Sequence, residues 1–267
     1  MSAVLARDVP EPLDAPRVLR AFARRPRGLF VDIDGTISAI ADTPEQATVS
    51  SECSDALRRL TRLLDVVCLL TGRPADDAWR MVGVDDAIYA GNHGAERWYR
   101  GELLRPPGMQ RYQGRLARAG GMLRALLANT SAIAFEDKGI GFAIHYRRDP
   151  SVGPAVLEAA TRVCRGLGLE VLQRTAHVEV RAPVPTDKGT ALTEIARCHG
   201  LAGLVVIGDD LVDAPAFAAA RSHARDTGAD VVVVTVGDQV RGHGDLSLDD
   251  PAGTCRLLDA VARELER

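Results

Sequence analysis

The chain has 267 residues, a formal net charge of −3, and 46% hydrophobic and 26% charged residues. This length suits one large α/β domain, or a core domain with a smaller insert, and the weak net charge argues against nucleic acid or an anionic membrane as a partner. The aromatic share of 4% argues against stacking platforms for bases. The five cysteines lack CxxC spacing, and no apolar run approaches the roughly 18 residues of a membrane span. Since no apolar stretch follows the first arginines, we expect a cytoplasmic protein with reduced thiols and no zinc site.

Residues 1–27 are rich in proline and arginine and are interpreted as an N-terminal extension with a short helix over 13–24. The run 28–31 is apolar, as in buried parallel strands, and leads into Asp32 and Asp34. Similar runs alternate with helix-like stretches: a helix over 54–64, a strand over 66–70, a helix over 188–199, a strand over 204–207, a helix over 214–224, a strand over 231–236 and a last helix over 251–264. This alternation predicts a parallel sheet with helices on both faces and a site at the carboxyl ends of its strands.

The middle of the chain breaks this alternation. Its pattern predicts a helix over 110–128, strands over 132–136 and 141–146, a helix over 152–166, and strands over 169–174 and 178–181. Paired antiparallel strands with two helices describe a separate α+β module, and prolines near both of its ends are typical of hinges. We therefore divide the chain into the extension 1–27, a first core part 28–105, an inserted domain 106–182 and a second core part 183–267.

Polar clusters end the predicted strands or begin the predicted helices. They are Asp32-Ile33-Asp34-Gly35-Thr36, Thr71-Gly72-Arg73, Asp187-Lys188-Gly189, and Gly208-Asp209-Asp210 with Asp213. Each alone has an ordinary explanation as a helix cap, a turn or an exposed lysine. The aspartates of the first and last clusters, five in all, lie on converging loops and repel one another unless a divalent cation lies among them. Carboxylates without His or Cys indicate that this cation is Mg²⁺. Lys188 and the Thr71 hydroxyl could bind a phosphoryl group, while two carboxylates two residues apart suit a nucleophile and a proton-transfer group.

These clusters, in this order, resemble the four motifs of the haloacid dehalogenase superfamily of phosphatases. The resemblance implies a Rossmann-like parallel-sheet core with an inserted α+β cap domain. It implies that Asp32 is the nucleophile that forms an aspartyl phosphate, and that Asp34 protonates the leaving oxygen and then activates water. Thr71 and Lys188 would hold the phosphoryl oxygens. Mg²⁺ would be bound by Asp32, the backbone carbonyl of Asp34 and Asp209, with Asp210 and Asp213 as outer or water-mediated partners.

A closer resemblance, to the trehalose-6-phosphate phosphatases, covers most of residues 28–215. It rests on Leu29-Phe30-Val31-Asp32-Ile33-Asp34-Gly35-Thr36 with Ile40-Ala41-Asp42-Thr43-Pro44, Thr71-Gly72-Arg73, Tyr89-Ala90-Gly91-Asn92-His93-Gly94-Ala95-Glu96, Glu136-Asp137-Lys138-Gly139, His145-Tyr146-Arg147, and Glu179-Val180-Arg181 before Asp187-Lys188-Gly189. In that family the insert closes over the sugar. The resemblance implies that sugar hydroxyls are bound by Glu136, Lys138 and Glu179. Further substrate-binding candidates are Gly72, Arg73, Asn92, His93 and Arg147.

Ordinary interpretations of these insert and loop residues stay open. The charges of residues 136–138 could be solvated at a hairpin turn, Arg147 could belong to a plain strand face, and His93 could order its loop. The last motif also departs from the family's usual Gly-Asp-Asp-x-Thr-Asp-Glu, because Val212 lacks the hydroxyl and Ala214 the carboxylate. The aspartates of the motif remain, so we expect catalysis to survive.

The sequence therefore predicts a Mg²⁺-dependent phosphatase of a small-molecule sugar phosphate, with trehalose 6-phosphate as the first expectation. We expect a cytoplasmic monomer with no nucleic-acid or membrane partner. Other hypotheses are a phosphatase of the same fold for glucosyl- or mannosyl-3-phosphoglycerate or sucrose phosphate, a mutase, and a non-catalytic regulatory module.

Overall fold

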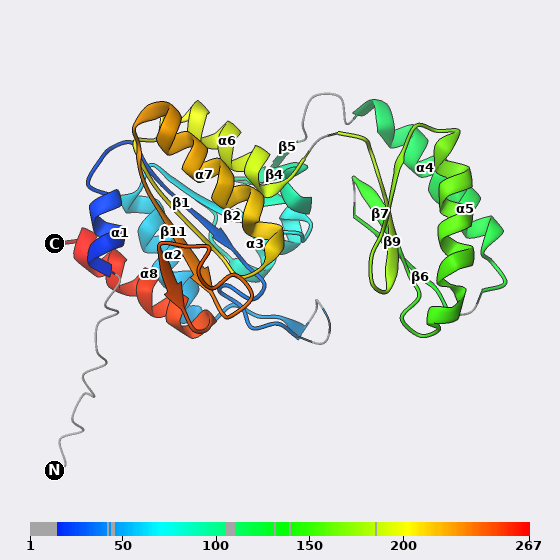
Figure 1. Ribbon diagram of the computed structural model, residues 1–267, viewed down its shortest axis with the longest axis horizontal. Helices are drawn as coiled ribbons and strands as arrows, with labels where there is room; N and C mark the ends of the chain where they lie inside the picture. Colours follow the sequence, from blue (N-terminus) through cyan, green and yellow to red (C-terminus); the bar gives the residue numbers. More distant parts are fainter. Residues whose placement is uncertain are drawn as a thin grey trace, which may run out of the picture.

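The computed structural model describes residues 15–41, 43, 46–104, 110–130, 132–138, 140–184 and 186–267. They fold around two β-sheets (Figure 1). The larger sheet has the strand order β12-β11-β10-β1-β2-β3-β4-β5, and the smaller sheet has the order β6-β7-β9-β8. The α/β fold class with a parallel-sheet core is thus confirmed.

The larger sheet is parallel from β12 to β3 and antiparallel at the β3-β4-β5 edge. Its strands are β1 (Arg27–Asp32), β2 (Val66–Leu70), β3 (Ile88–Gly91), β4 (Glu96–Tyr99), β5 (Glu102–Leu104), β10 (Gly203–Gly208), β11 (Asp230–Val236) and β12 (Leu246–Leu248). Every residue of β1, β2 and β10 is buried. That burial explains why these strands are continuous apolar runs in the sequence.

Helices cover both faces of the larger sheet. They are α1 (Ala15–Ala21), α2 (Ser51–Leu63), α3 (Ala75–Val82), α6 (Lys188–Cys198), α7 (Ala214–Thr227) and α8 (Pro251–Leu265). Leu29 and Val31 of β1 pack in one hydrophobic cluster with α1, α2, α3 and α8, while Phe30 packs in another with α6 and α7. This alternation follows from the two-residue period of side chains along a strand. The predicted core elements lie within three residues of the observed ones, as far as those residues are described.

Helix α1 departs from the interpretation of residues 1–27 as an extension. Ala15, Val18 and Ala21 are buried in the same cluster as β1, and Phe22 is only 1% exposed. Residues 15–27 therefore pack as part of the core. Their few apolar residues lie among arginines and prolines, so the sequence does not indicate this burial. Residues 1–14 lie outside the described residues.

The smaller sheet belongs to the inserted module, residues 110–182. Its elements are α4 (Gln110–Leu126), β6 (Ala134–Asp137), β7 (Gly141–His145), α5 (Gly153–Arg165), β8 (Glu170–Gln173) and β9 (His177–Arg181), each within two residues of the predicted bounds. Phe142, Ile144 and Val178 pack in one hydrophobic cluster with α4 and α5. Figure 1 shows both helices on the side of this sheet that faces away from the core. The division at 106 and 182 stays a prediction, and residue 106 lies outside the described residues.

The helices within the described ranges include none that is both long enough and apolar enough to cross a bilayer.

Candidate functional site

Three neighbouring parallel strands deliver polar side chains to one edge of the larger sheet. Asp32 is the last residue of β1, Thr71 follows β2, and Asp209 follows β10. Because β1 pairs in parallel with both β2 and β10, the carboxyl ends of the three strands lie side by side. This edge is where open α/β sheets place their sites.

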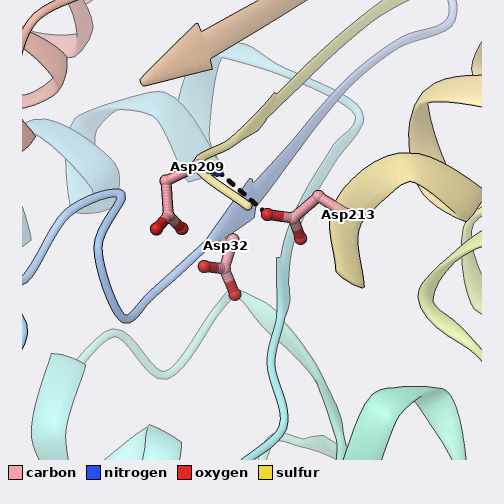
Figure 2. Close-up of side chains that lie close together, drawn as sticks. All are labelled: Asp32, Asp209 and Asp213. Carbon is pink, nitrogen blue, oxygen red and sulfur yellow. Dashed lines mark hydrogen bonds between the residues drawn. The ribbon is translucent and has the colours of Figure 1, made fainter. Parts of the chain in front are cut away.

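The centre of the site is a group of aspartates around one lysine. Carboxylate oxygens of Asp32, Asp209 and Asp213 all lie within 4.8 Å of one another (Figure 2). The Nζ of Lys188 lies 2.6 Å from Oδ1 of Asp32 and 2.6 Å from Oδ1 of Asp213. The Thr36 hydroxyl contacts Asp32 Oδ2 at 3.3 Å and Asp209 Oδ1 at 3.0 Å. Thr36 is a member of the first motif to which the sequence assigned no role.

The electrostatics of this group favour a bound cation. Burial raises the pKa of Asp32 well above its usual value; the Lys188 charge opposes the rise and the Asp213 charge adds to it. Burial likewise raises the pKa of Asp209. Burial acts to lower the pKa of Lys188, but the charges of Asp32 and Asp213 outweigh it, so that pKa is raised and the ammonium is retained. Three carboxylates thus lie together while the ammonium of Lys188 pairs with two of them, and this all-oxygen donor set fits a hard divalent cation such as Mg²⁺.

Local hydrogen bonds of the last motif hold Asp213 in place. One oxygen of Asp213 accepts the backbone N–H groups of Asp209 at 2.9 Å and Asp210 at 3.3 Å. The side chain of Asp210 instead accepts from the backbone N–H of Val212 at 2.7 Å and caps the short helix η4 (Leu211–Asp213). The structure thus brings Asp213 to the centre of the site, whereas the carboxylate of Asp210 shapes the turn.

Asp34 lies beside this centre and makes a different contact. Its carboxylate is bound at both oxygens by the guanidinium of Arg73, with both N–O distances at 2.7 Å. Arg73 was predicted as a substrate ligand, but here it holds Asp34. Directly after Asp34 the chain turns at Gly35, with φ +87°, where a Cβ would lie 2.0 Å from Asp209 Oδ2. Only glycine allows this approach.

A short helical turn, η2 (Asn92–Gly94), covers the second motif. The backbone N–H of Asn92 donates to Arg73 O at 2.7 Å, and that of His93 to Thr71 O at 2.8 Å. The His93 ring lies against Gly72, where a Cβ would come within 2.8 Å of it. Burial lowers the pKa of His93 to about 4, with the positive charge of Lys188 as the next cause. His93 is therefore neutral near pH 7, and its backbone N–H ties this loop to Thr71.

The sugar-binding candidates lie on the inserted module. Glu136 and Glu179 both pair with Ala143 of β7, so they share the sheet face opposite to Phe142 and Ile144. A nitrogen of His145 lies 2.7 Å from Glu136 Oε2, a partner that the sequence did not predict. Lys138 follows β6 at the turn, and its backbone carbonyl accepts from the Asn92 side chain at 3.0 Å. Arg147 is exposed beyond the end of β7.

The lowered pKa of His93 predicts a pH-dependent stability. The unfolded chain binds this proton near pH 6.5 and the folded chain only near pH 4, so stability rises with pH between these values. The contribution of the neutral His93 to the free energy of unfolding is complete above pH 6.5 and is lost as the pH falls to 4. Relative to a His93→Asn variant, which tolerates the left-handed backbone, the free energy of unfolding should fall by about 3 kcal/mol from pH 7 to pH 4. Urea unfolding of both proteins measures the difference, and a constant difference would contradict the buried, neutral histidine.

Residues 30–252 match the family model described as trehalose-phosphatase. A trehalose-phosphate phosphatase from Mycolicibacterium paratuberculosis is 33% identical over 92% of this chain and 64% of its own length. An uncharacterized glycosyl hydrolase from Mycobacterium tuberculosis is 32% identical over 91% of this chain and 19% of its own length. The chain thus spans about a fifth of one of these relatives and under two thirds of the other.

Solved structures agree on the fold. A trehalose-6-phosphate phosphatase related protein superposes with a TM-score of 0.73 at 21% identity, covering 89% of this chain and 97% of the other. A haloacid dehalogenase-like hydrolase from Bacteroides thetaiotaomicron superposes with a TM-score of 0.59 at 15% identity, covering 90% of this chain and 98% of the other. The family match extends over the four motifs and the inserted module alike. The chain therefore belongs to the trehalose-phosphatase family.

Proposed function

We propose that this chain is a Mg²⁺-dependent phosphatase that hydrolyses a sugar phosphate, with trehalose 6-phosphate as the substrate, through an aspartyl phosphate on Asp32. The observation that carries the proposal is the buried contact of Lys188 with Asp32 and Asp213 at the end of the central strand. Family membership supports the phosphatase reaction. The names of two relatives mention trehalose phosphate and so support trehalose 6-phosphate as the substrate.

Asp32 is held ready for attack on phosphorus. It is 5% exposed, one of its oxygens contacts Lys188 and the other accepts from Thr36. A bond forms between a carboxylate oxygen of Asp32 and phosphorus while the bond from phosphorus to the sugar oxygen breaks. Lys188, with the hydroxyl of Thr71, stabilises the charge on the remaining phosphoryl oxygens. Mg²⁺ held by Asp32, Asp209 and the backbone of Asp34 would neutralise further charge, with Asp210 and Asp213 behind it.

Asp34 supplies the proton transfers in this proposal. Its protonated carboxyl group would give its proton to the departing sugar oxygen. The resulting carboxylate would then take a proton from the water that attacks the aspartyl phosphate, which releases phosphate and restores Asp32. In the ligand-free protein Arg73 fixes this carboxylate through two charge-assisted hydrogen bonds. Each oxygen of Asp34 keeps a second lone pair for the transferred proton, so Arg73 can position Asp34 while the transfers take place.

The inserted module would act as the cap that recognises the sugar. Glu136 and Glu179 lie on its helix-free face, and Lys138 stands at the turn that contacts Asn92 of the core. The charges of Glu179 and Lys138 both act on the pKa of His93, in keeping with a position above the second motif. Charged groups give strong hydrogen bonds to hydroxyls, and a site built on them discriminates among sugars.

The nucleophile is tested with Asp32→Asn. The amide cannot form the acyl phosphate, so phosphate release should fall below about a thousandth of the wild-type rate. The fold should persist, because the variant removes one of three crowded carboxylates while Lys188 keeps Asp213. Asp226→Asn, on the exposed far end of α7, is the matched control. A folded Asp32→Asn protein with activity above this limit would refute covalent catalysis at Asp32.

The metal is tested by chelation and by thermal stability. Excess chelator should stop phosphate release, Mg²⁺ should restore it, and Ca²⁺ should restore it poorly because it prefers more ligands and longer bonds. Independently of activity, Mg²⁺ should raise the melting temperature of the wild type and should do so much less in Asp209→Asn. Full activity in excess chelator, or an equal thermal shift in both proteins, would argue against the site.

The cap residues are tested by comparing two substrates. Glu136→Ala, Lys138→Ala and Glu179→Ala should each lower kcat/KM for trehalose 6-phosphate about ten- to a hundredfold, the value of a lost charged hydrogen bond of about 1.5–3 kcal/mol. A small aryl phosphate lacks the sugar, so its kcat/KM should stay near wild type. Lys188→Ala should lose both activities.

Glu158→Ala, on the outer helix α5, is the matched control for the cap variants. Unchanged kcat/KM in all three cap variants would refute the proposed sugar contacts. The proposed phosphoryl site would not be affected by that result. Hydrolysis of a different sugar phosphate in preference to trehalose 6-phosphate would reassign the substrate alone.

A further inference from the structure

Asn92 lies where the core meets the inserted module, and its side-chain amide is fully engaged as a donor. Its Nδ2 donates to Oε1 of Glu96 at 2.8 Å and to the backbone carbonyl of Lys138 at 3.0 Å. A side-chain amide carries two N–H groups, so both are used. Both partners are acceptors, which also fixes the orientation of the amide. No N–H of this amide is left for a sugar hydroxyl.

Glu96 orients this amide. It is the first residue of β4, is only 2% exposed, and its Oε1 also accepts the backbone N–H of Ala75 at 2.8 Å. Ala75 begins α3, whose preceding residue, Pro74, makes no side-chain cap. The buried carboxylate therefore serves the positive end of a helix and Asn92 at once, an arrangement that leaves it little freedom.

The backbone of Asn92 is fixed as firmly as its side chain. Asn92 and His93 adopt left-handed φ angles of 49° and 57°, and asparagine is among the residues that tolerate this conformation. Their N–H groups donate to the carbonyls of Arg73 and Thr71, in the second motif. Asn92 is thus anchored in the phosphate-binding edge of the core, while its side chain extends to the turn of the inserted module.

We propose that Asn92 and Glu96 are positioning residues that dock the inserted module on the core. Glu96 orients the amide of Asn92, and the hydrogen bond to the Lys138 carbonyl sets how far the turn stands from the second motif. Asn92 is then a docking residue, and its Oδ1 is the side-chain atom left to accept from a sugar hydroxyl. The consequence for sugar binding rests on the proposed function, since the side chain of Lys138 is a sugar ligand there; the docking contact itself does not.

The hydrogen bond from Asn92 to the Lys138 carbonyl joins neutral groups, and Ala95 packs beside it in the hydrophobic cluster of the module. Such a bond shifts an equilibrium by a factor of about 2 to 12, so it favours one placement of the module without locking it. A cap that admits a substrate and releases a product needs a contact of this reversible kind.

The experiment measures the placement directly, without substrate. Spin labels are attached through Glu158→Cys on α5 and Arg225→Cys on α7, in a Cys198→Ser background because Cys198 is exposed. Pulsed electron-spin distance measurements then compare the ligand-free wild type with Asn92→Ala and Lys138→Ala. Asn92→Ala should reduce the population at the wild-type distance, relative to all other distances, about 2- to 12-fold. Lys138→Ala should retain it, because that variant keeps the backbone carbonyl that accepts the bond.

Variants of Glu96 test its part in the docking. Glu96→Ala should shift the distances as Asn92→Ala does, and Glu96→Gln, which keeps an acceptor oxygen, should restore them. If Glu96→Ala fails to fold, the double variant Glu96→Gln/Asn92→Ala is measured instead. It should show the same distance shift as Asn92→Ala alone. In kinetics, Asn92→Ala should lower kcat/KM for the sugar phosphate by at least the same 2- to 12-fold.

Unaltered distances in Asn92→Ala would overturn the inference. An equal shift in Lys138→Ala would overturn it too, since the lysine side chain would then carry the contact. If the wild type hydrolyses no sugar phosphate, the proposed function fails, and the distance measurement still decides the docking role.

Discussion

The site depends on one buried ion pair network, the ammonium of Lys188 between Asp32 and Asp213. Burying these charges costs free energy. Removal of one partner from a buried pair leaves an uncompensated charge and destabilises a fold by about 3–5 kcal/mol. The fold supplies the partners from three separate places: the end of β1, the first turn of α6 and the turn after β10. Asp187 caps α6 and so fixes where Lys188 begins that helix. The parallel pairing of β1 with β10 and the packing of α6 against α7 and η4 bring these places together.

Much of this architecture could be predicted from the sequence, because buried parallel strands are continuous apolar runs and the module's hairpins alternate with amphipathic helices. Two parts could not. The edge strands β4 and β5 are short and carry mixed polar and apolar residues, so their pairing depends on β3 beside them. The helix α1 was predicted but its burial was not, because that burial comes from contacts with residues far along the chain in α8 and β11.

The candidate site shows the same limit at the level of side chains. The motifs predicted which residues meet at the strand ends, because their order along the chain fixes their edge of the sheet. They did not predict the partners: Arg73 on Asp34, His145 on Glu136, and Glu96 on Asn92. These pairs join residues whose relation depends on the packing of loops. Glu96 carried one signal, its place as the last residue of the quoted motif 89–96, but a sequence alone gives no measure of its burial.

The altered last motif illustrates how backbone groups can preserve a site when side chains change. Asp210 caps η4 through the backbone N–H of Val212, a donor that any residue except proline supplies. The Val212 side chain is 47% exposed, so the missing hydroxyl leaves no buried acceptor unpaired at that position. Asp213 is likewise held by backbone N–H groups, those of Asp209 and Asp210. The geometry of the three central carboxylates therefore does not require a threonine at 212 or a glutamate at 214, which is why a departure from the family pattern there is compatible with an intact phosphoryl site.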